Sequence, residues 1–257
     1  MKFSIIGTGN MAWFFSKRIA AAGHSCAGVY GRDEKKAAEL ADALLAPAFG
    51  AIEKVRDQDA DVCFLAVADD ALEEVASKLS FKHTVLVHMA GAQRLDIIKA
   101  GAEDFAVLWP IYSVLRNNLP RHRDIPCAWE VSSVRAKRFA LEMAHCVSDI
   151  LFEADFEKRQ WLHLSAVMTN NFINHLLSIN EKICQENDLP ANALQPLIDQ
   201  TFERVKNHSP LTTQTGPAIR NDLNTIEKHL ELLAKKPQLK KVYKAMTDSI
   251  QALHKQK

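Results

Sequence analysis

The most constraining feature of this chain is a glycine turn close to its start, Gly7-Thr8-Gly9-Asn10-Met11-Ala12. An apolar segment at residues 3–6 precedes the turn, and a segment of helical spacing follows it and ends before Gly23. A strand, a tight turn and a helix in this order form the context in which G-x-G-x-x-A indicates dinucleotide binding. Gly7 permits the turn, Gly9 lets backbone approach a diphosphate, and Ala12 lets helix and strand pack closely. The phosphates would lie on the free N–H groups of the helix. The alternative is an ordinary strand-to-helix turn.

The end of the second predicted strand, residues 24–30, bears on which dinucleotide is bound. An NAD site places an acidic side chain there, on the ribose 2′-hydroxyl. This chain has Gly31 and then Arg32, whose guanidinium can bind a 2′-phosphate, so the sequence favours NADP. The alternative is that Arg32 is a solvated surface residue. We interpret Asp33 as the N-cap of the next helix.

Strands and helices alternate through the first part of the chain. Further strands are predicted at residues 61–67, 84–88, 105–110, 125–131 and 148–153, and helices at 33–45, 70–79 and 133–146. This alternation predicts an α/β fold with a doubly wound, Rossmann-type parallel sheet. We assign residues 1–154 to a dinucleotide-binding domain.

Ligands of such sheets bind beyond the carboxyl ends of the strands. We therefore expect cofactor contacts at Val67 and Ala68 as well as at the glycine turn and Arg32. His88 ends the next strand and is either a proton donor or a structural hydrogen-bonding residue. Asp69 and Asp70 resemble a paired carboxylate, but two acids after a strand are more often the start of a helix. The basic segment at 116–123 is either a solvated loop or one that meets an anionic substrate.

Residues 155–257 are predicted to form a helical substrate and dimerisation domain. Its first helix, residues 158–187, is apolar around most of its circumference and is therefore expected to be buried. A polar stripe follows helical steps along it, with Asn171 beside the stripe: His163, Asn170, Asn174, Ser178 and Glu181. The partners of these side chains are one another, a ligand or a second subunit, and the ligand alternative places His163 and Asn170 or Asn171 at the nicotinamide. Further helices are predicted at 191–208, 218–234 and 237–255, with a loop at 209–217.

Composition excludes several classes of function. Lys plus Arg is 32 and Asp plus Glu is 31, so no charge bias favours nucleic acid or a membrane surface, and we expect a small-molecule substrate. The five cysteines are odd in number and form no C-x-x-C pair, which favours a reducing cytoplasm. The ten histidines lack H-E-x-x-H spacing, so no metal site is predicted. The glycine turn begins too early for a signal peptide before it, and no apolar run approaches membrane-spanning length.

The combination resembles the NADP oxidoreductases that join a Rossmann-like domain to a helical domain of unknown function. More distantly it resembles pyrroline-5-carboxylate reductase, 3-hydroxyisobutyrate dehydrogenase and 6-phosphogluconate dehydrogenase. The resemblance covers nearly the whole chain. It rests on the glycine turn, Gly31-Arg32, the segments 88–92 and 215–222, and His163 with Asn171.

Two residues depart from these families. The closer family usually has a His-Pro pair after the fifth strand, and this chain has Trp109-Pro110. The better-known dehydrogenases carry a lysine on the long helix as acid or base, where this chain offers His163 and asparagines. An imidazole can transfer a proton near neutral pH, whereas asparagine can only orient a substrate.

Two hypotheses of function follow. The first is an NADP-dependent reductase of a small carbonyl or imine, in which His163 or His88 supplies the proton and Asn171 orients the substrate. Thr215 and Arg220 would close the cleft. The second is a non-catalytic NADP-binding sensor or assembly module, which Trp109 and the absent lysine favour. The apolar long helix further predicts a homodimer formed through the helical domains.

Overall fold

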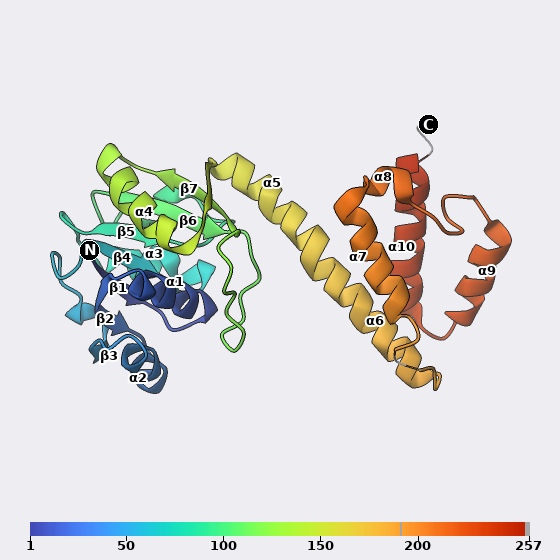
Figure 1. The fold of residues 1–257 in the computed structure, drawn as a ribbon, viewed down its shortest axis with the longest axis horizontal. Coiled ribbons are helices and arrows are strands. Elements are labelled where there is room, and N and C mark those ends of the chain that lie inside the picture. The colour runs from blue at the N-terminus through green and yellow to red at the C-terminus, as the bar shows by residue number, and fades with distance from the viewer. Residues whose placement is uncertain (191, 255–257) are drawn as a thin grey trace. The chain divides into compact units, whose positions relative to one another are not determined.

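The computed structural model describes residues 1–190 and 192–254 of the chain (Figure 1). The chain divides into two compact units, Met1–His175 and Leu176–Lys257. The boundary predicted at residue 154 coincides with the end of the sheet, whereas the two compact units divide further along, inside a long helix.

The first unit contains one sheet of eight strands in the order β3-β2-β1-β4-β5-β6-β7-β8. The strands are β1 (Lys2–Ile6), β2 (Ser25–Tyr30), β3 (Ala48–Phe49), β4 (Val62–Leu65), β5 (Val85–His88), β6 (Phe105–Pro110), β7 (Pro126–Val131) and β8 (Ile150–Glu153). The doubly wound sheet predicted from the alternation is confirmed. In parallel register Ile6 pairs with Leu65, and Leu65 pairs with His88, which aligns the carboxyl ends of the central strands.

Two features of the sheet were not predicted. The short strand β3 lies between Pro47 and Gly50, where the sequence shows only turn signals. Strands β6 and β7 are antiparallel. A parallel pair needs a crossover, usually helical, and the described connection at 111–125 contains no helix, so the chain returns in the opposite direction.

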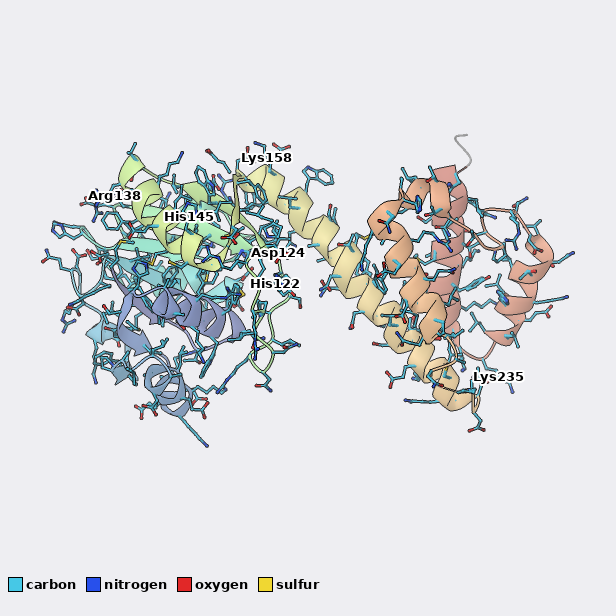
Figure 2. The ribbon with its side chains drawn as sticks, viewed as in Figure 1. His122, Asp124, Arg138, His145, Lys158 and Lys235 are labelled. Atoms are coloured by element: carbon cyan, nitrogen blue, oxygen red, sulfur yellow. The ribbon has the colours of Figure 1, made fainter. Side chains whose placement is uncertain are left out.

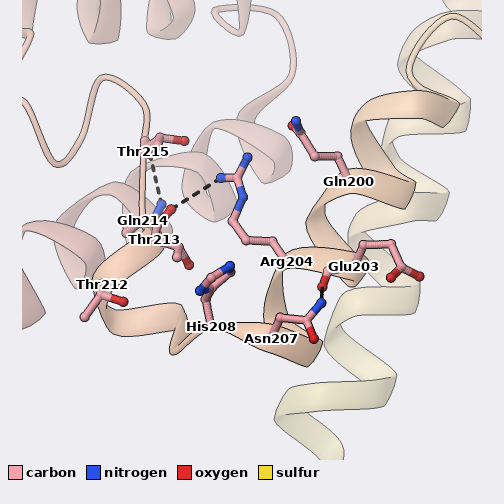
Figure 3. Close-up of a pocket in the computed structure, with 9 residues that line it drawn as sticks. All are labelled: Gln200, Glu203, Arg204, Asn207, His208, Thr212, Thr213, Gln214 and Thr215. Carbon is pink, nitrogen blue, oxygen red and sulfur yellow. Dashed lines mark hydrogen bonds between the residues drawn. The ribbon is translucent and has the colours of Figure 1, made fainter.

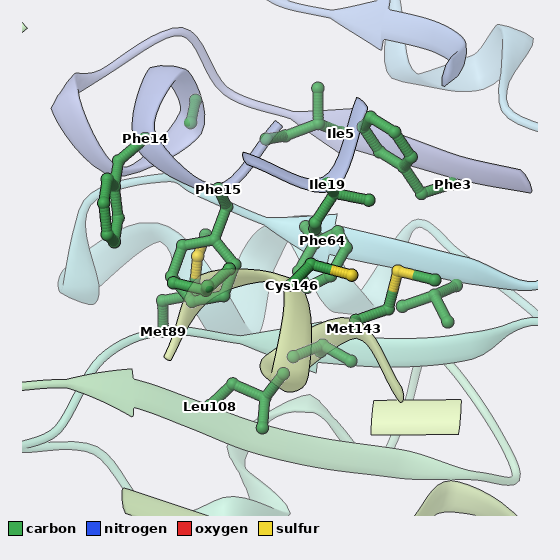
Figure 4. Packing of buried hydrophobic residues seen from close by; sticks show 14 of the residues in the cluster. Phe3, Ile5, Phe14, Phe15, Ile19, Phe64, Met89, Leu108, Met143 and Cys146 are labelled. Atoms are coloured by element: carbon green, nitrogen blue, oxygen red, sulfur yellow. The ribbon is translucent and has the colours of Figure 1, made fainter. Parts of the chain in front are cut away.

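Helices cover both faces of this sheet. Helices α1 (Asn10–Ala21), α2 (Glu34–Asp42) and α4 (Val134–Val147) pack on one face, and α3 (Leu72–Ser77) packs on the other. The larger core has Phe14, Phe15 and Ile19 of α1 against Phe3 and Phe64 of the strands (Figure 4). Asp33 is the N-cap of α2, and Ser133 is the N-cap of α4. Asp33 accepts a hydrogen bond from the Lys36 N–H, as its predicted capping role requires.

A continuous helical run follows the sheet: α5 (Phe156–Ala166), a π-helical segment η4 (Val167–Asn171) and α6 (Phe172–Glu186). The predicted long helix is thus present, but the expectation that it is buried is wrong. Trp161 is 65% exposed, Met168 53% and Phe172 51%. Apolar side chains surround most of this helix, and the described chain covers only part of its circumference.

The second unit is helical, and no strand follows β8 in the described residues. It contains α7 (Gln195–Asn207), α8 (Pro210–Thr213), α9 (Leu223–Leu232) and α10 (Pro237–His254). One predicted helix starts at Ala191 and another finishes at Lys255, and both of these residues lie outside the described residues. The helix predicted from residue 218 begins later because Asn221 has a φ of +53°, which breaks helical geometry, and Asp222 caps the new start. Among the described residues no helix is long and apolar enough to span a membrane.

Candidate functional site

The glycine turn lies where β1 meets both β2 and β4, the point at which strand order reverses in sheets of this kind. Gly7 has a φ of +115°, and its N–H donates to the Tyr30 carbonyl at 2.8 Å. A Cβ at Gly7 would lie 2.2 Å from the Ala66 carbonyl oxygen. Val67 follows directly, so the turn packs against the end of β4. The predicted residues Gly7, Val67 and Ala68 therefore come together at one edge of the sheet.

Space remains open over the other glycine of the turn. A Cβ at Gly9 would meet nothing within 4 Å, and Gly9 caps α1 without any side-chain hydrogen bond. No acidic residue lies in the first turn of α1. The backbone N–H groups of Asn10, Met11 and Ala12 have no acceptor among the described residues. Unpaired N–H groups at a helix N-terminus with room above them fit a diphosphate.

Arg32 lies beside this turn. A Cβ at Gly31 would lie 2.9 Å from Cγ2 of Thr8, so the end of β2 packs closely against the glycine turn. Arg32 forms no ion pair or hydrogen bond within the described part of the chain. Its charge reaches Glu74 of α3, whose pKa is lowered chiefly by Lys78 and to a smaller extent by Arg32. An unpaired guanidinium at this strand end fits a 2′-phosphate.

His88 ends β5 and is fully buried. Its Nδ1 accepts a hydrogen bond from the Ala90 N–H at 3.3 Å, and its Nε2 has no partner in the described chain. Burial, with a smaller effect of Arg159, lowers the pKa of His88 to about 4. The imidazole is therefore neutral at physiological pH and out of contact with solvent. This placement favours the structural alternative over the proton donor.

Arg159, in the first turn of α5, is a buried residue that sequence reasoning missed. It forms an ion pair with Glu130 of β7. Its guanidinium also donates to the backbone carbonyls of Ala154 and Gln93, both at 2.9 Å. These bonds attach the start of the long helix to the sheet. No pattern in the sequence separates Arg159 from a surface arginine.

A second group of side chains converges on the same edge of the sheet. The Trp109 indole, at the end of β6, is 8% exposed and lies against Gly91, where a Cβ would be 2.2 Å from Cδ2 of the ring. The His163 ring of α5 lies 5.9 Å from the indole between centroids, at 44°. Burial raises the pKa of Asp69, and the neighbouring His163 partly offsets that rise. Trp109 and His163 are thus in ring contact, and the charge of His163 acts on Asp69.

Asn170, Asn171 and Thr215 are not among the side chains of this group. Asn170 and Asn171 are exposed in η4, and π-helical segments occur frequently at functional sites. Asp69 and Asp70 form the start of a 3₁₀ turn, η2 (Asp69–Ala71), before α3, as the alternative interpretation had it. Thr215 lies in the second unit.

Thr215 lines a pocket of about 590 Å³ beside α7 and α8 (Figure 3). All of its lining residues are of polar type: Gln200, Glu203, Arg204, Asn207, His208, Thr212, Thr213, Gln214 and Thr215. Arg204 donates from Nη1 to the Thr213 carbonyl at 3.5 Å. Arg220 is not part of this lining. No group of three or more His, Cys, Asp or Glu side chains that could hold a metal occurs in the described residues.

Comparisons with known proteins place this geometry among oxidoreductases. Residues 2–91 match the family described as NADP oxidoreductase, coenzyme F420-dependent, and residues 125–250 match a domain of unknown function, DUF2520. A candidate NADP oxidoreductase from Bacteroides fragilis is 30% identical, with 98% of each chain covered and a TM-score of 0.88. The search of curated proteins gave no match.

Two more distant structures share the fold. The 1-pyrroline-5-carboxylate reductase of Streptococcus pyogenes is 17% identical, with 98% of each chain covered and a TM-score of 0.62. A reductive aminase from Aspergillus terreus, in complex with NADPH and ethyl-5-oxohexanoate, is 14% identical with a TM-score of 0.69. That comparison covers 98% of this chain and 97% of the aminase.

Proposed function

Because this chain belongs to the family of NADP oxidoreductases that join an N-terminal cofactor domain to a DUF2520 domain, we propose that it reduces a small carbonyl or imine compound. NADP was predicted as the cofactor from Arg32, and membership of this family confirms that prediction. The single observation that carries the proposal is the group Asp69, Trp109 and His163 at the strand edge that also holds the glycine turn.

When bound, NADPH would supply a hydride for the carbon of the C=O or C=N bond. The chain must hold the diphosphate on the first turn of α1 and the 2′-phosphate on Arg32. His163 gives a proton to the oxygen or nitrogen of the same bond, so that one hydride and one proton complete the reduction. Trp109 supports the His163 ring, and the Asn171 amide orients the substrate. His88 stays neutral beneath the site as a positioning residue for the segment 88–91.

The test is substrate-dependent loss of NADPH absorbance, using a panel of cyclic imines, 2-oxo acids and aldehydes. His163→Gln keeps the size and polarity of the side chain but cannot transfer a proton, so we expect kcat to fall about 10²-fold or more with NADPH affinity unchanged. His145→Gln, at an exposed histidine of α4 (Figure 2), is the matched control. Equal turnover of His163→Gln and the parent would contradict the assignment.

A second candidate function is a non-catalytic NADP sensor or assembly module. It is favoured by Trp109, which stands where the family usually has histidine, and by the absence of lysine from 156–171 except at Lys158, which pairs with Asp155. In that case the purified protein binds NADPH but oxidises it with no compound in the panel.

We further propose that two copies associate through the helical run. The exposed apolar side chains Trp161, Leu164, Met168 and Phe172 recur every three or four residues and so follow one strip of the helix. An apolar strip of this length on a soluble helix indicates an interface. Analytical ultracentrifugation should show a dimer at micromolar concentration and a monomer after Met168→Glu. A monomeric parent protein would count against it.

We also propose a cytoplasmic location, which agrees with the cysteines. All five are free thiols, and burial raises the pKa of both Cys63 and Cys127 to about 12. Such thiols are unreactive and behave as small apolar side chains in a reducing compartment. Fractionation of cells that express the tagged chain tests the location.

A further inference from the structure

A pocket in the first unit lies between α1 and the loop at 111–125, which runs beside that helix (Figure 1). Its volume is about 500 Å³, within the range of small-molecule sites. Four cations and two apolar side chains form most of its lining: Lys17, Arg18, Arg116, Arg121, Phe14 and Leu119. Phe14 is fully buried behind this lining, and the Arg18 guanidinium lies 5.7 Å from the centroid of its ring.

The positive charge of this pocket is largely uncompensated. No acidic residue lines it. Arg116 pairs with Glu39, but Arg18 donates only to the backbone carbonyls of Pro120 and His122, both at 2.6 Å. Lys17 and Arg121 have no ion pair within the described part of the chain. Three positive charges therefore face one cavity in a chain whose net charge is +1.

The surroundings do not cancel this charge. Burial, and the neighbouring Arg123 next, lower the pKa of Arg18, while Asp149 acts weakly in the opposite direction. Asp149 is bound to Arg123 at 2.6 Å, and Asp124 is hydrogen-bonded to His122 on the same loop (Figure 2). The nearby carboxylates are thus already engaged with other side chains.

We propose that this pocket binds a small phosphorylated compound with an apolar part. Guanidinium groups donate in a fork that matches a phosphate, and the three positive charges are enough to neutralise a phosphate monoester dianion. The apolar part would lie on Leu119, which is partly exposed. The residues of α1 that line the pocket begin in its second turn, whereas the cofactor diphosphate would bind at the first turn. The two sites are therefore separate.

The loop that forms the pocket also supports the cofactor turn. The Arg116 N–H donates to Oδ1 of Asn10 at 3.1 Å, and the Arg116 guanidinium lies 4.3 Å from the centroid of the Trp13 ring. A phosphate held by Arg18 and Arg121 would order this loop and, through Arg116, hold Asn10 in place. Binding at one site therefore strengthens binding at the other, and the effect is reciprocal. The inference requires NADPH binding but not the proposed reaction.

Calorimetric titration of the full chain with phenyl phosphate tests the pocket. The protein is first saturated with NADPH, so that the diphosphate position is filled. The variant Lys17→Ala/Arg121→Ala removes two exposed cations, and Arg138→Ala/Lys235→Ala removes two exposed cations elsewhere (Figure 2). We expect the first variant to bind phenyl phosphate about tenfold or more weakly, and the second to bind as the parent does. Methyl phosphate, which lacks the ring, should bind the parent less well.

No binding by the NADPH-saturated parent overturns the proposal, as does equal weakening in both variants, which would indicate only general charge attraction. The coupling is tested by the NADPH dissociation constant with and without phenyl phosphate. We expect phenyl phosphate to tighten NADPH binding several-fold in the parent and to leave it unchanged in Lys17→Ala/Arg121→Ala. Equal NADPH affinity in the parent under both conditions overturns the coupling. Circular dichroism checks that both variants are folded.

Discussion

Gly7 and Gly91 lie at the same edge of the sheet, and a Cβ at either position would come 2.2 Å from another atom. The neighbours differ in kind. At Gly7 the obstacle is the Ala66 backbone carbonyl, and the φ of +115° itself disfavours any other residue. At Gly91 the obstacle is the Trp109 side chain, with no unusual φ. One glycine is required by the backbone, and the other is required by one side chain that evolution or mutagenesis can change.

The largest effect is expected from Gly7→Ala. The added methyl group meets a backbone atom that cannot move aside, and the residue must adopt a strained φ, so we expect a loss of about 3 kcal/mol of unfolding free energy. NADPH binding should be lost with the turn. Urea unfolding and calorimetric titration measure the two effects. A variant as stable as the parent would show that the turn can rearrange.

Gly9→Ala is the matched control for that variant. Its Cβ meets nothing within 4 Å, so the stability should change by less than about 0.5 kcal/mol. The methyl group would nevertheless occupy the space over the first turn of α1, and NADPH affinity should fall. If both stability and affinity are unchanged, the diphosphate does not lie there.

The folded chain should lose stability in acid because of His88, which lies shortly before Gly91 in the sequence. The pKa of His88 is about 4 in the folded chain and 6.5 when unperturbed, so between these values the unfolded state binds the extra proton. Neutral His88 therefore contributes fully to the unfolding free energy above pH 6.5, and this contribution is lost as the pH falls toward 4. Between pH 7 and pH 5 the loss is about 2 kcal/mol.

Urea unfolding at both pH values measures this dependence against His88→Asn. Asparagine can accept the hydrogen bond from the Ala90 N–H but does not titrate. The variant should therefore lose less stability than the parent between pH 7 and pH 5. An identical loss in both proteins would contradict the assigned burial.

At Gly91 we expect a smaller effect than at Gly7, and one that a second substitution can relieve. Gly91→Ala forces the indole aside and should lower the unfolding free energy by about 2 kcal/mol. In a Trp109→Leu background the same change should cost little, with an interaction energy of about 1–2 kcal/mol in a double-mutant cycle. Additive effects would mean that the indole moves freely, and Gly91 would then resemble Gly9.

The smallest change is expected from Arg32→Ala. The side chain is exposed, so stability should not change, but NADPH affinity should fall about tenfold, which is about 1.4 kcal/mol, while NADH affinity stays the same. Calorimetric titration with both cofactors measures the selectivity. If the affinities for NADPH and NADH fall equally, Arg32 attracts both cofactors by its charge alone and does not recognise the 2′-phosphate.

Most of the fold could be predicted from the sequence, together with half of the candidate site. The glycine turn, the Asp33 cap and Arg32 at the strand end depend on residues within a few positions of one another, and backbone geometry links such positions directly. The parts that failed involve partners far apart in the chain. Arg18, for example, bonds a carbonyl 104 residues away, and no local pattern reports this contact.

The sequence by itself thus determined the strand-turn-helix cofactor motif, the order of the elements and the choice of NADP over NAD. Only the tertiary structure decided that His88 is buried and neutral, that Arg159 attaches the long helix to the sheet, and that the helix leaves an apolar strip exposed. The physical reason is that hydrogen-bond spacing and φ preferences act along the chain. Burial, by contrast, depends on which distant surfaces meet and on how much apolar surface they can cover.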